Sequence, residues 1–138
     1  YEMFKMKPVG KYLVNVCGTM SCALMGAADV IHRAEQVLGI RVGDTTEDGL
    51  FTLEQAECQA ACTEAPCLQV NYRYRYRVTP GQVEVLIDDL RNGRLDDEIP
   101  PHGTVAKVRQ RIPDDRAVGA VPPDEVTGPP AWMQGAGQ

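Results

Sequence analysis

Four of the five cysteines in this chain form two close pairs, and no other feature of the sequence restricts the fold as strongly. The first pair is Cys17 and Cys22, and the second is Cys58 and Cys62, so four and three residues separate the partners. Each pair stands where an apolar run ends and small residues begin. The pattern predicts that two loops converge and that their four thiolates bind one inorganic centre.

Length and charge narrow the class of protein. A chain of 138 residues is large enough to bury a core without disulfides. Its net charge of −5 argues against a general nucleic-acid binder, and no apolar run is long enough for direct membrane insertion. An odd number of cysteines, in a chain without the features of a small secreted domain, favours a reducing compartment and a metal centre with one thiol left over.

The first half of the chain reads as strand, helix and strand. Alternation over residues 11–17 predicts a half-buried strand that ends at Cys17. Helical spacing predicts one helix over residues 22–38, with Ser21 at its start and Gly39 at its end. Cys22 would then lie in the first helical turn, where unpaired N–H groups are expected to lower the pKa of its thiol.

The second half predicts more strands and a second helix. A turn-rich segment over residues 43–49 leads to a strand over residues 50–57, which delivers Cys58 to the edge of the sheet. An apolar run over residues 67–70 resumes the sheet. Tyrosine and arginine alternate over residues 72–77, which favours an edge strand whose arginines discourage edge pairing or meet acidic groups on a partner. Thr79, Pro80 and Gln82 form a capping box that starts a helix ending at Asn92.

This element order predicts an α/β fold with the cysteine loops together at one end of a small sheet. Proline and glycine dominate the sequence from about residue 100, so we expect a domain over residues 1–104 and an extended tail over residues 105–138. The tail contains Trp132, the only tryptophan, next to two prolines. We expect the tail to lie across a neighbouring subunit with Trp132 as its anchor.

The four paired cysteines allow three chemistries. A four-cysteine zinc site in a structural or interaction module is the first, although the usual zinc knuckle places two residues between its cysteines. Disulfides are the second, but nothing in the sequence indicates secretion. A [2Fe–2S] cluster is the third, because two irons with two thiolates each match two separate pairs of soft ligands.

The residues around the cysteines add a family resemblance. The segment Thr46-Glu-Asp-Gly-Leu-Phe-Thr-Leu, the Ala65-Pro66 step after the last paired cysteine and the Thr79-Pro80 helix start accompany the two cysteine pairs. Together they resemble the thioredoxin-like [2Fe–2S] ferredoxin family, and within it the 24-kDa subunits of respiratory complex I. The resemblance covers about residues 1–104.

The resemblance implies a thioredoxin-like fold, a small mixed sheet with flanking helices, in which Cys17, Cys22, Cys58 and Cys62 hold one [2Fe–2S] cluster. It implies an electron-transfer subunit of NADH:quinone oxidoreductase that docks on a flavoprotein carrying FMN and the NADH site. Such subunits lie in the peripheral arm, on the cytoplasmic side of the bacterial inner membrane or the matrix side of the mitochondrial one. NAD-linked hydrogenases and formate dehydrogenases use similar subunits.

Other residues receive simpler interpretations. Cys67 is expected to be a buried small hydrophobic residue and not a ligand. His32 and His102 are expected at the surface. No Walker loop or Gly-x-Gly-x-x-Gly motif is present, so NADH and flavin must bind to another polypeptide, and the isolated chain should have no catalytic activity of its own.

Overall fold

The computed structural model describes residues 5–103, and in this part of the chain the predicted α/β order is confirmed. Four strands form one mixed sheet in the order β2-β1-β3-β4. They are β1 (Tyr12–Cys17), β2 (Phe51–Ala56), β3 (Leu68–Val70) and β4 (Arg73–Arg75). Strand β1 pairs with β2 in parallel and with β3 antiparallel, and β4 is an edge strand, as predicted.

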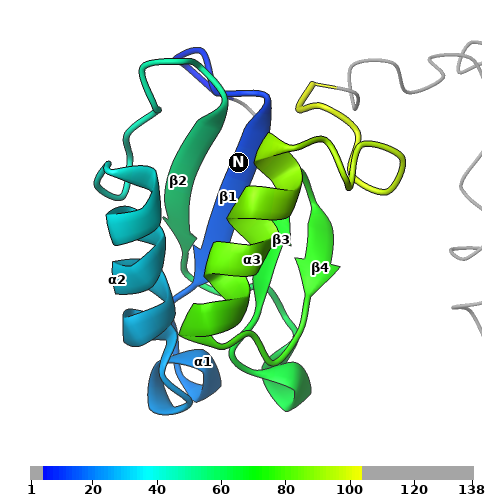
Figure 1. Cartoon of the computed structure of the whole chain (residues 1–138). Coiled ribbons are helices and arrows are strands. Elements are labelled where there is room, and N and C mark those ends of the chain that lie inside the picture. Colours follow the sequence, from blue (N-terminus) through cyan, green and yellow to red (C-terminus); the bar gives the residue numbers. More distant parts are fainter. Residues whose placement is uncertain (1–4, 104–138) are drawn as a thin grey trace, which may run out of the picture. The chain divides into compact units, whose positions relative to one another are not determined.

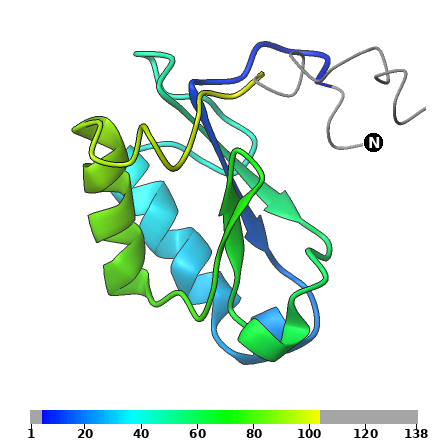
Figure 2. The same cartoon turned by 90° about the vertical axis from the view of Figure 1, so that its right-hand side faces the viewer.

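Two helices, α2 (Ala27–Leu38) and α3 (Pro80–Arg91), cover one face of this sheet (Figure 1 and Figure 2). The apolar side chains of β1, β2 and β3 pack against them in the main core, which includes Tyr12, Val14, Phe51 and Leu68. The predicted capping box is present, since Gln82 N donates to Thr79 Oγ1 and Thr79 N donates to Gln82 Oε1. Burial of these side chains from water is the main stabilising contribution to the packing of helices on sheet.

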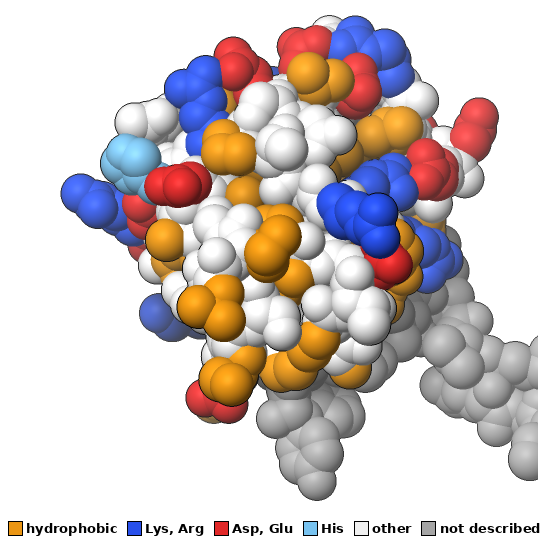
Figure 3. Space-filling view, turned by 90° about the horizontal axis from the view of Figure 1, so that it is seen from below, with side chains coloured by type: hydrophobic (Ala, Val, Ile, Leu, Met, Phe, Trp, Pro, Cys, Tyr) orange, Lys and Arg blue, Asp and Glu red, His pale blue; other side chains and the backbone are white. Residues whose placement is uncertain are grey.

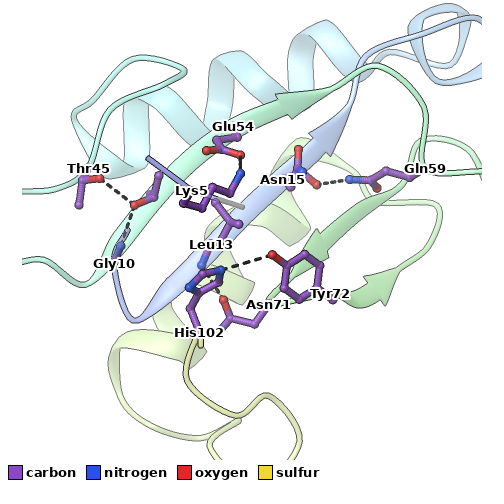
Figure 4. Close-up of polar contacts among 11 residues, drawn as sticks. Lys5, Gly10, Leu13, Asn15, Thr45, Glu54, Gln59, Asn71, Tyr72 and His102 are labelled. Carbon is purple, nitrogen blue, oxygen red and sulfur yellow. Dashed lines mark hydrogen bonds and ion pairs between the residues drawn. The ribbon is translucent and has the colours of Figure 1, made fainter. Parts of the chain in front are cut away.

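Strand β1 is buried on both faces, so the prediction of a half-buried strand was wrong. Loops and polar side chains cover the face opposite the helices, as Figure 4 shows. Leu13 N donates to the Asn71 side chain at 2.7 Å, and that side chain donates to Pro100 O at 2.8 Å. Lys5 forms an ion pair with Glu54 at 2.6 Å above the same region. These contacts exclude water from a strand whose sequence alternation suggested one wet face.

The helix predicted over residues 22–38 is broken in two. Helix α1 (Ser21–Leu24) ends near Gly26, which has a φ of 97°, and α2 begins directly after it. Ser21 is therefore the first residue of α1 and makes no side-chain cap. A residue without a Cβ accepts this left-handed conformation at low cost, which lets the chain change direction between the two helices. Gly39 ends α2 as predicted.

The strand predicted over residues 72–77 is shorter, because Asn71 and Tyr72 have φ angles of 46° and 67° and form a turn. Two of the three arginines in this segment meet acidic groups within the chain. Arg75 pairs with Glu98 at 2.7 Å and Arg77 with Glu64 at 2.8 Å, both within this chain.

The predicted tail over residues 105–138, including Trp132, lies outside the described residues, so its boundary and role remain predictions. Among the helices of residues 5–103, none combines the length and the apolar character that crossing a membrane requires.

Candidate metal centre

All five cysteines lie at one end of the sheet, where β1 and β2 end and β3 begins. This end is called the cysteine edge below. Cys17 is the last residue of β1, and Cys58 follows the end of the parallel strand β2 by two residues. Cys67 directly precedes the antiparallel strand β3, which starts at the same edge. This edge is at the bottom of Figure 1, between α1 and the short 3-10 helix η1 (Cys62–Glu64). The predicted convergence of the cysteine loops is confirmed.

Hydrogen bonds join the three cysteine-bearing segments. Cys17 N donates to Cys67 O at 3.1 Å, and Gly18 N donates to Ala56 O at 3.0 Å. The Thr19 hydroxyl donates to Glu57 O. The loop after β1 is therefore tied both to the start of β3 and to the end of β2.

Three thiols are buried together at this edge. Cys17 is 3% exposed, Cys22 1% and Cys67 1%. Their sulfur atoms all lie within 4.8 Å of one another, and the Sγ atoms of Cys22 and Cys67 are 3.7 Å apart. Burial of Cys67 was predicted, but its contact with two of the predicted ligands was not. The contact depends on the pairing of β3 with β1, which places Cys67 beside the end of the strand that carries Cys17.

The second predicted pair has a different environment. Cys58 and Cys62 are both exposed, and neither belongs to the buried thiol group. Ala60 N donates to Cys58 Sγ at 3.4 Å, and Cys62 is the first residue of η1. The structure therefore brings Cys17 and Cys22 together and leaves Cys58 and Cys62 on the adjacent loop.

Gln59 holds this loop on the sheet, and sequence reasoning missed it because an isolated glutamine carries no motif. It is 6% exposed, and its Nε2 donates to Asn15 O at 2.7 Å (Figure 4). Tyr74 Oη donates to the Gln59 carbonyl at 2.6 Å, and Cys67 Sγ donates to Gln59 Oε1 at 3.7 Å. Gln59 thus connects the exposed pair to the buried group.

The buried thiols differ in acidity. Burial raises the pKa of the Cys17 thiol, but hydrogen bonds from the backbone of Thr19 and Gln59 outweigh it, and the pKa lies below its usual range. Burial and the neighbouring Cys17 raise the pKa of Cys22. The expectation of a lowered pKa at Cys22 was therefore wrong, because burial and the neighbouring Cys17 outweigh the hydrogen bonds from Cys67, which lower the pKa. Burial, with Cys22 and Cys17 nearby, raises the pKa of Cys67 to about 12.

The histidines do not join the centre. His32 is exposed on α2, as expected. His102 is only partly exposed, contrary to expectation, because its ring nitrogen lies 3.4 Å from Tyr72 Oη and its backbone N donates to Lys11 O. The group of metal-binding side chains found among residues 5–103 consists of cysteines alone.

The donor type fits an iron–sulfur cluster, because every metal-binding side chain in this group is a thiol. Thiolates are the ligands that iron–sulfur clusters and zinc share, and a [2Fe–2S] cluster requires four of them. Of the four predicted ligands, Cys17 is buried at the end of β1 and Cys22 in α1, and the other two lie on or next to the loop that Gln59 and Thr19 tie to this part of the fold.

Comparison with known proteins agrees with this fit. Residues 1–91, which include all five cysteines, match the family model described as thioredoxin-like [2Fe-2S] ferredoxin. An NADH-quinone oxidoreductase subunit of Rickettsia felis is 45% identical over 92 residues, covering 67% of this chain and 55% of that protein. The subunit of the same name from Mycobacterium tuberculosis is 34% identical over 137 residues, covering 94% of this chain and 51% of that protein. The chain thus spans about half the length of these curated relatives.

Solved structures show the same fold at lower identity. A chain of an NAD+-reducing [NiFe]-hydrogenase in the air-oxidized state aligns with a TM-score of 0.63 and 19% identity, covering 69% of this chain and 17% of that one. A thioredoxin-like [2Fe-2S] ferredoxin from Aquifex aeolicus aligns with a TM-score of 0.51 and 20% identity, covering 62% of this chain and 84% of that one. The match over residues 1–91, the mixed sheet with its helices and the gathered cysteines show that this chain belongs to the thioredoxin-like [2Fe–2S] ferredoxin family.

Proposed function

We propose that this chain is an electron-transfer subunit that holds one [2Fe–2S] cluster through Cys17, Cys22, Cys58 and Cys62. The observation that carries the proposal is the family match over residues 1–91, which contain both cysteine pairs. The cluster would supply one-electron chemistry at this edge. The residues of this chain would hold the cluster in place and would surround it with hydrogen bonds and buried side chains.

The two pairs have separate tasks in this proposal. Backbone N–H groups of Thr19 and Gln59 point at the Cys17 sulfur and favour its thiolate form, which is the form that binds iron. Hydrogen bonds to ligand sulfurs and burial are also the levers by which a protein tunes the potential of such a centre. Cys58 and Cys62 lie on the solvent side, where a redox partner would approach.

The proposed partner is a flavoprotein that carries FMN and the NADH site of an NADH:quinone oxidoreductase. Met20, Leu24 and Met25 are 79%, 87% and 62% exposed at the cysteine edge. Figure 3 shows this edge from below, with hydrophobic side chains near its centre and charged ones mostly toward its margin. An apolar patch beside the cluster gives the flavoprotein a docking surface that keeps electron transfer short. The flavoprotein of an NAD+-reducing hydrogenase is the second candidate, because a chain of such an enzyme has this fold.

Membership of this complex would place the chain in the peripheral arm, on the cytoplasmic or matrix side of the membrane. The ferredoxin domain would comprise residues 1–104. Residues 105–138 would form the tail that contacts a neighbouring subunit through Trp132.

The experiment is to reconstitute the full chain with iron and sulfide and to record its absorption and its EPR spectrum after dithionite reduction. We expect a brown protein with one [2Fe–2S] cluster that NADH reduces only when the flavoprotein is added. A colourless protein that retains zinc and takes up no iron would support the four-cysteine zinc module instead. Flavin that stays with the isolated chain through gel filtration would contradict the assignment of FMN to the partner.

A further inference from the structure

Cys67 has no role in the proposed cluster, yet its Sγ atom lies 3.7 Å from the Sγ atom of Cys22, a predicted ligand. We propose that the thiols of Cys17, Cys22 and Cys67 form a site for a single thiophilic divalent cation of the zinc class when the chain carries no cluster.

The first argument is the spacing of the sulfur atoms. In a tetrahedral site with Zn–S bonds of about 2.3 Å, two bound sulfurs lie about 3.8 Å apart. The Sγ atoms of Cys22 and Cys67 are already 3.7 Å apart, and no pair in the group of three exceeds 4.8 Å. An ion would therefore draw the sulfurs together by about 1 Å at most.

The second argument is the rigidity of the three positions. Cys17 and Cys67 are joined by a backbone hydrogen bond of 3.1 Å between neighbouring strands, and Cys22 N donates to Thr19 O at 3.0 Å. The Cys67 sulfur is directed by its contact with Gln59 Oε1, whose amide is fixed in turn on Asn15 O. Cys58 and Cys62 are instead exposed, on a loop that Gln59 ties to the sheet. Three preorganised thiols bind an ion with less loss of conformational freedom than two buried and two exposed ones.

The third argument is the coordination number. Three thiolates leave one tetrahedral position of the ion for water or a small-molecule thiol. The site shares Cys17 and Cys22 with the proposed cluster, so the two occupants exclude each other. This exclusion rests on the proposed function, whereas binding of the ion does not.

The direct test uses Co²⁺ as the probe on the full chain, after removal of any cluster and full reduction of the thiols. We expect one Co²⁺ per chain, with sulfur-to-metal charge transfer and the intense visible bands of a tetrahedral ion. Cys67→Ser should weaken binding by more than about tenfold, since even an outer-shell partner is worth that much. The double variant Cys58→Ser/Cys62→Ser should bind like the unsubstituted chain.

The opposite pattern would overturn the proposal. Binding that requires Cys58 and Cys62 but not Cys67 means that the ion takes the four paired cysteines, and absence of stoichiometric binding means that no such site exists. Circular dichroism checks that Cys67→Ser and Cys67→Ala remain folded. If both Cys67 variants are unfolded, the double variant Cys58→Ser/Cys62→Ser still decides the question, because its substitutions are at exposed positions and should leave the chain folded.

A second measurement separates this proposal from the proposed function. Zn²⁺ added before iron and sulfide should slow cluster formation by at least about tenfold in the unsubstituted chain and much less in Cys67→Ser. A chain that binds Co²⁺ through Cys67 but never forms a cluster would retain the ion site and lose the proposed function. A chain that forms the cluster at the same rate with and without Zn²⁺ would contradict the exclusion.

Discussion

The two cysteine pairs share one edge of the sheet but differ in how the fold holds them. Cys17 and Cys22 are buried and hydrogen-bonded into the ends of β1 and α1, whereas Cys58 and Cys62 are exposed on a loop anchored mainly by Gln59. Burial by the fold itself fixes the first pair. The second pair depends on a few polar contacts and on whatever the thiols bind.

The difference separates two requirements that a cysteine ligand must meet. A buried thiol supports the fold even when nothing is bound, because its removal leaves a gap or an unpaired hydroxyl. An exposed thiol contributes little to the fold, so its substitution should act mainly on what the thiol binds. The same type of residue thus has two different stability signatures at one site.

The largest expected effect is loss of the cluster. Cys17→Ser, Cys22→Ser, Cys58→Ser and Cys62→Ser should each abolish or gravely alter the absorption and EPR signals after reconstitution, because a [2Fe–2S] cluster needs four thiolates. Cys67→Ser should keep both signals. If Cys67→Ser loses iron as completely as the others, the proposed ligand set is wrong.

In the chain without a cluster, the same variants test whether the two cysteine pairs differ in their contribution to the free energy of unfolding. Denaturant unfolding should show a loss of about 1–3 kcal/mol for Cys17→Ser and Cys22→Ser, since each buries a hydroxyl in a thiol-sized space. Cys58→Ser and Cys62→Ser should stay within about 0.5 kcal/mol of the unsubstituted chain. Equal losses for both pairs would mean that the second pair is not exposed in solution.

Sequence patterns predicted the part of this site that strand direction controls. Cys17 and Cys58 end or follow parallel strands, so their convergence was predictable from alternation and turn residues alone. The fold class and the start of α3 at the Thr79 capping box were predictable for the same reason: each depends on local pattern.

Other features depend on contacts that are distant in the sequence. The burial of β1 on both faces depends on Asn71, which lies far along the chain from Leu13, and on Lys5, which the distant Glu54 holds over the sheet. The break at Gly26 was missed because apolar residues continue at helical spacing across it. The position of Cys67 beside Cys22 depends on the register of β3 against β1, which no local pattern states.

Gln59 offers the sharpest test of how the exposed pair is held. Gln59→Ala removes the amide that donates to Asn15 O and meets the Cys67 thiol, so unfolding free energy should fall by about 1–3 kcal/mol. The cluster should also be lost faster to a chelator, because the loop between Cys58 and Cys62 loses its anchor.

The matched control is Gln36→Ala, on the exposed side of α2, which should change the free energy of unfolding by less than about 0.5 kcal/mol. A Gln59 variant as stable as this control would show that the loop is held by other contacts.

Gly26 tests how the buried pair is held, through the turn that places α1 and Cys22. A Cβ at this position would meet only Asp29 Oδ2, at 3.8 Å, so the cost of Gly26→Ala comes from its φ of 97° and not from a clash. We expect a loss of about 1–2 kcal/mol in thermal or denaturant unfolding. Gly81→Ala in α3 has open space and an ordinary φ, and should be neutral or stabilising by up to about 1 kcal/mol. Equal effects of the two substitutions would mean that residue 26 does not adopt this conformation.

The smallest expected effect lies at the opposite end of the sheet and tests whether the cysteine edge behaves independently. Burial lowers the pKa of His102, with a smaller contribution from Lys5 that Glu54 opposes. A histidine whose pKa is lower in the folded chain than in the unfolded chain stabilises the fold fully above the unfolded value, and this stability is lost as pH falls through the interval between the two values. The melting temperature should therefore decrease as pH falls from about 7 to about 5.5, by less than the change caused by Gly26→Ala, while the spectrum of the reconstituted cluster stays constant.

The control variant is His102→Gln, which should keep a polar side chain near Tyr72 and remove the decrease from this pH interval. A decrease that persists in His102→Gln, or one that appears together with cluster loss, would assign the pH dependence to the cysteine edge instead.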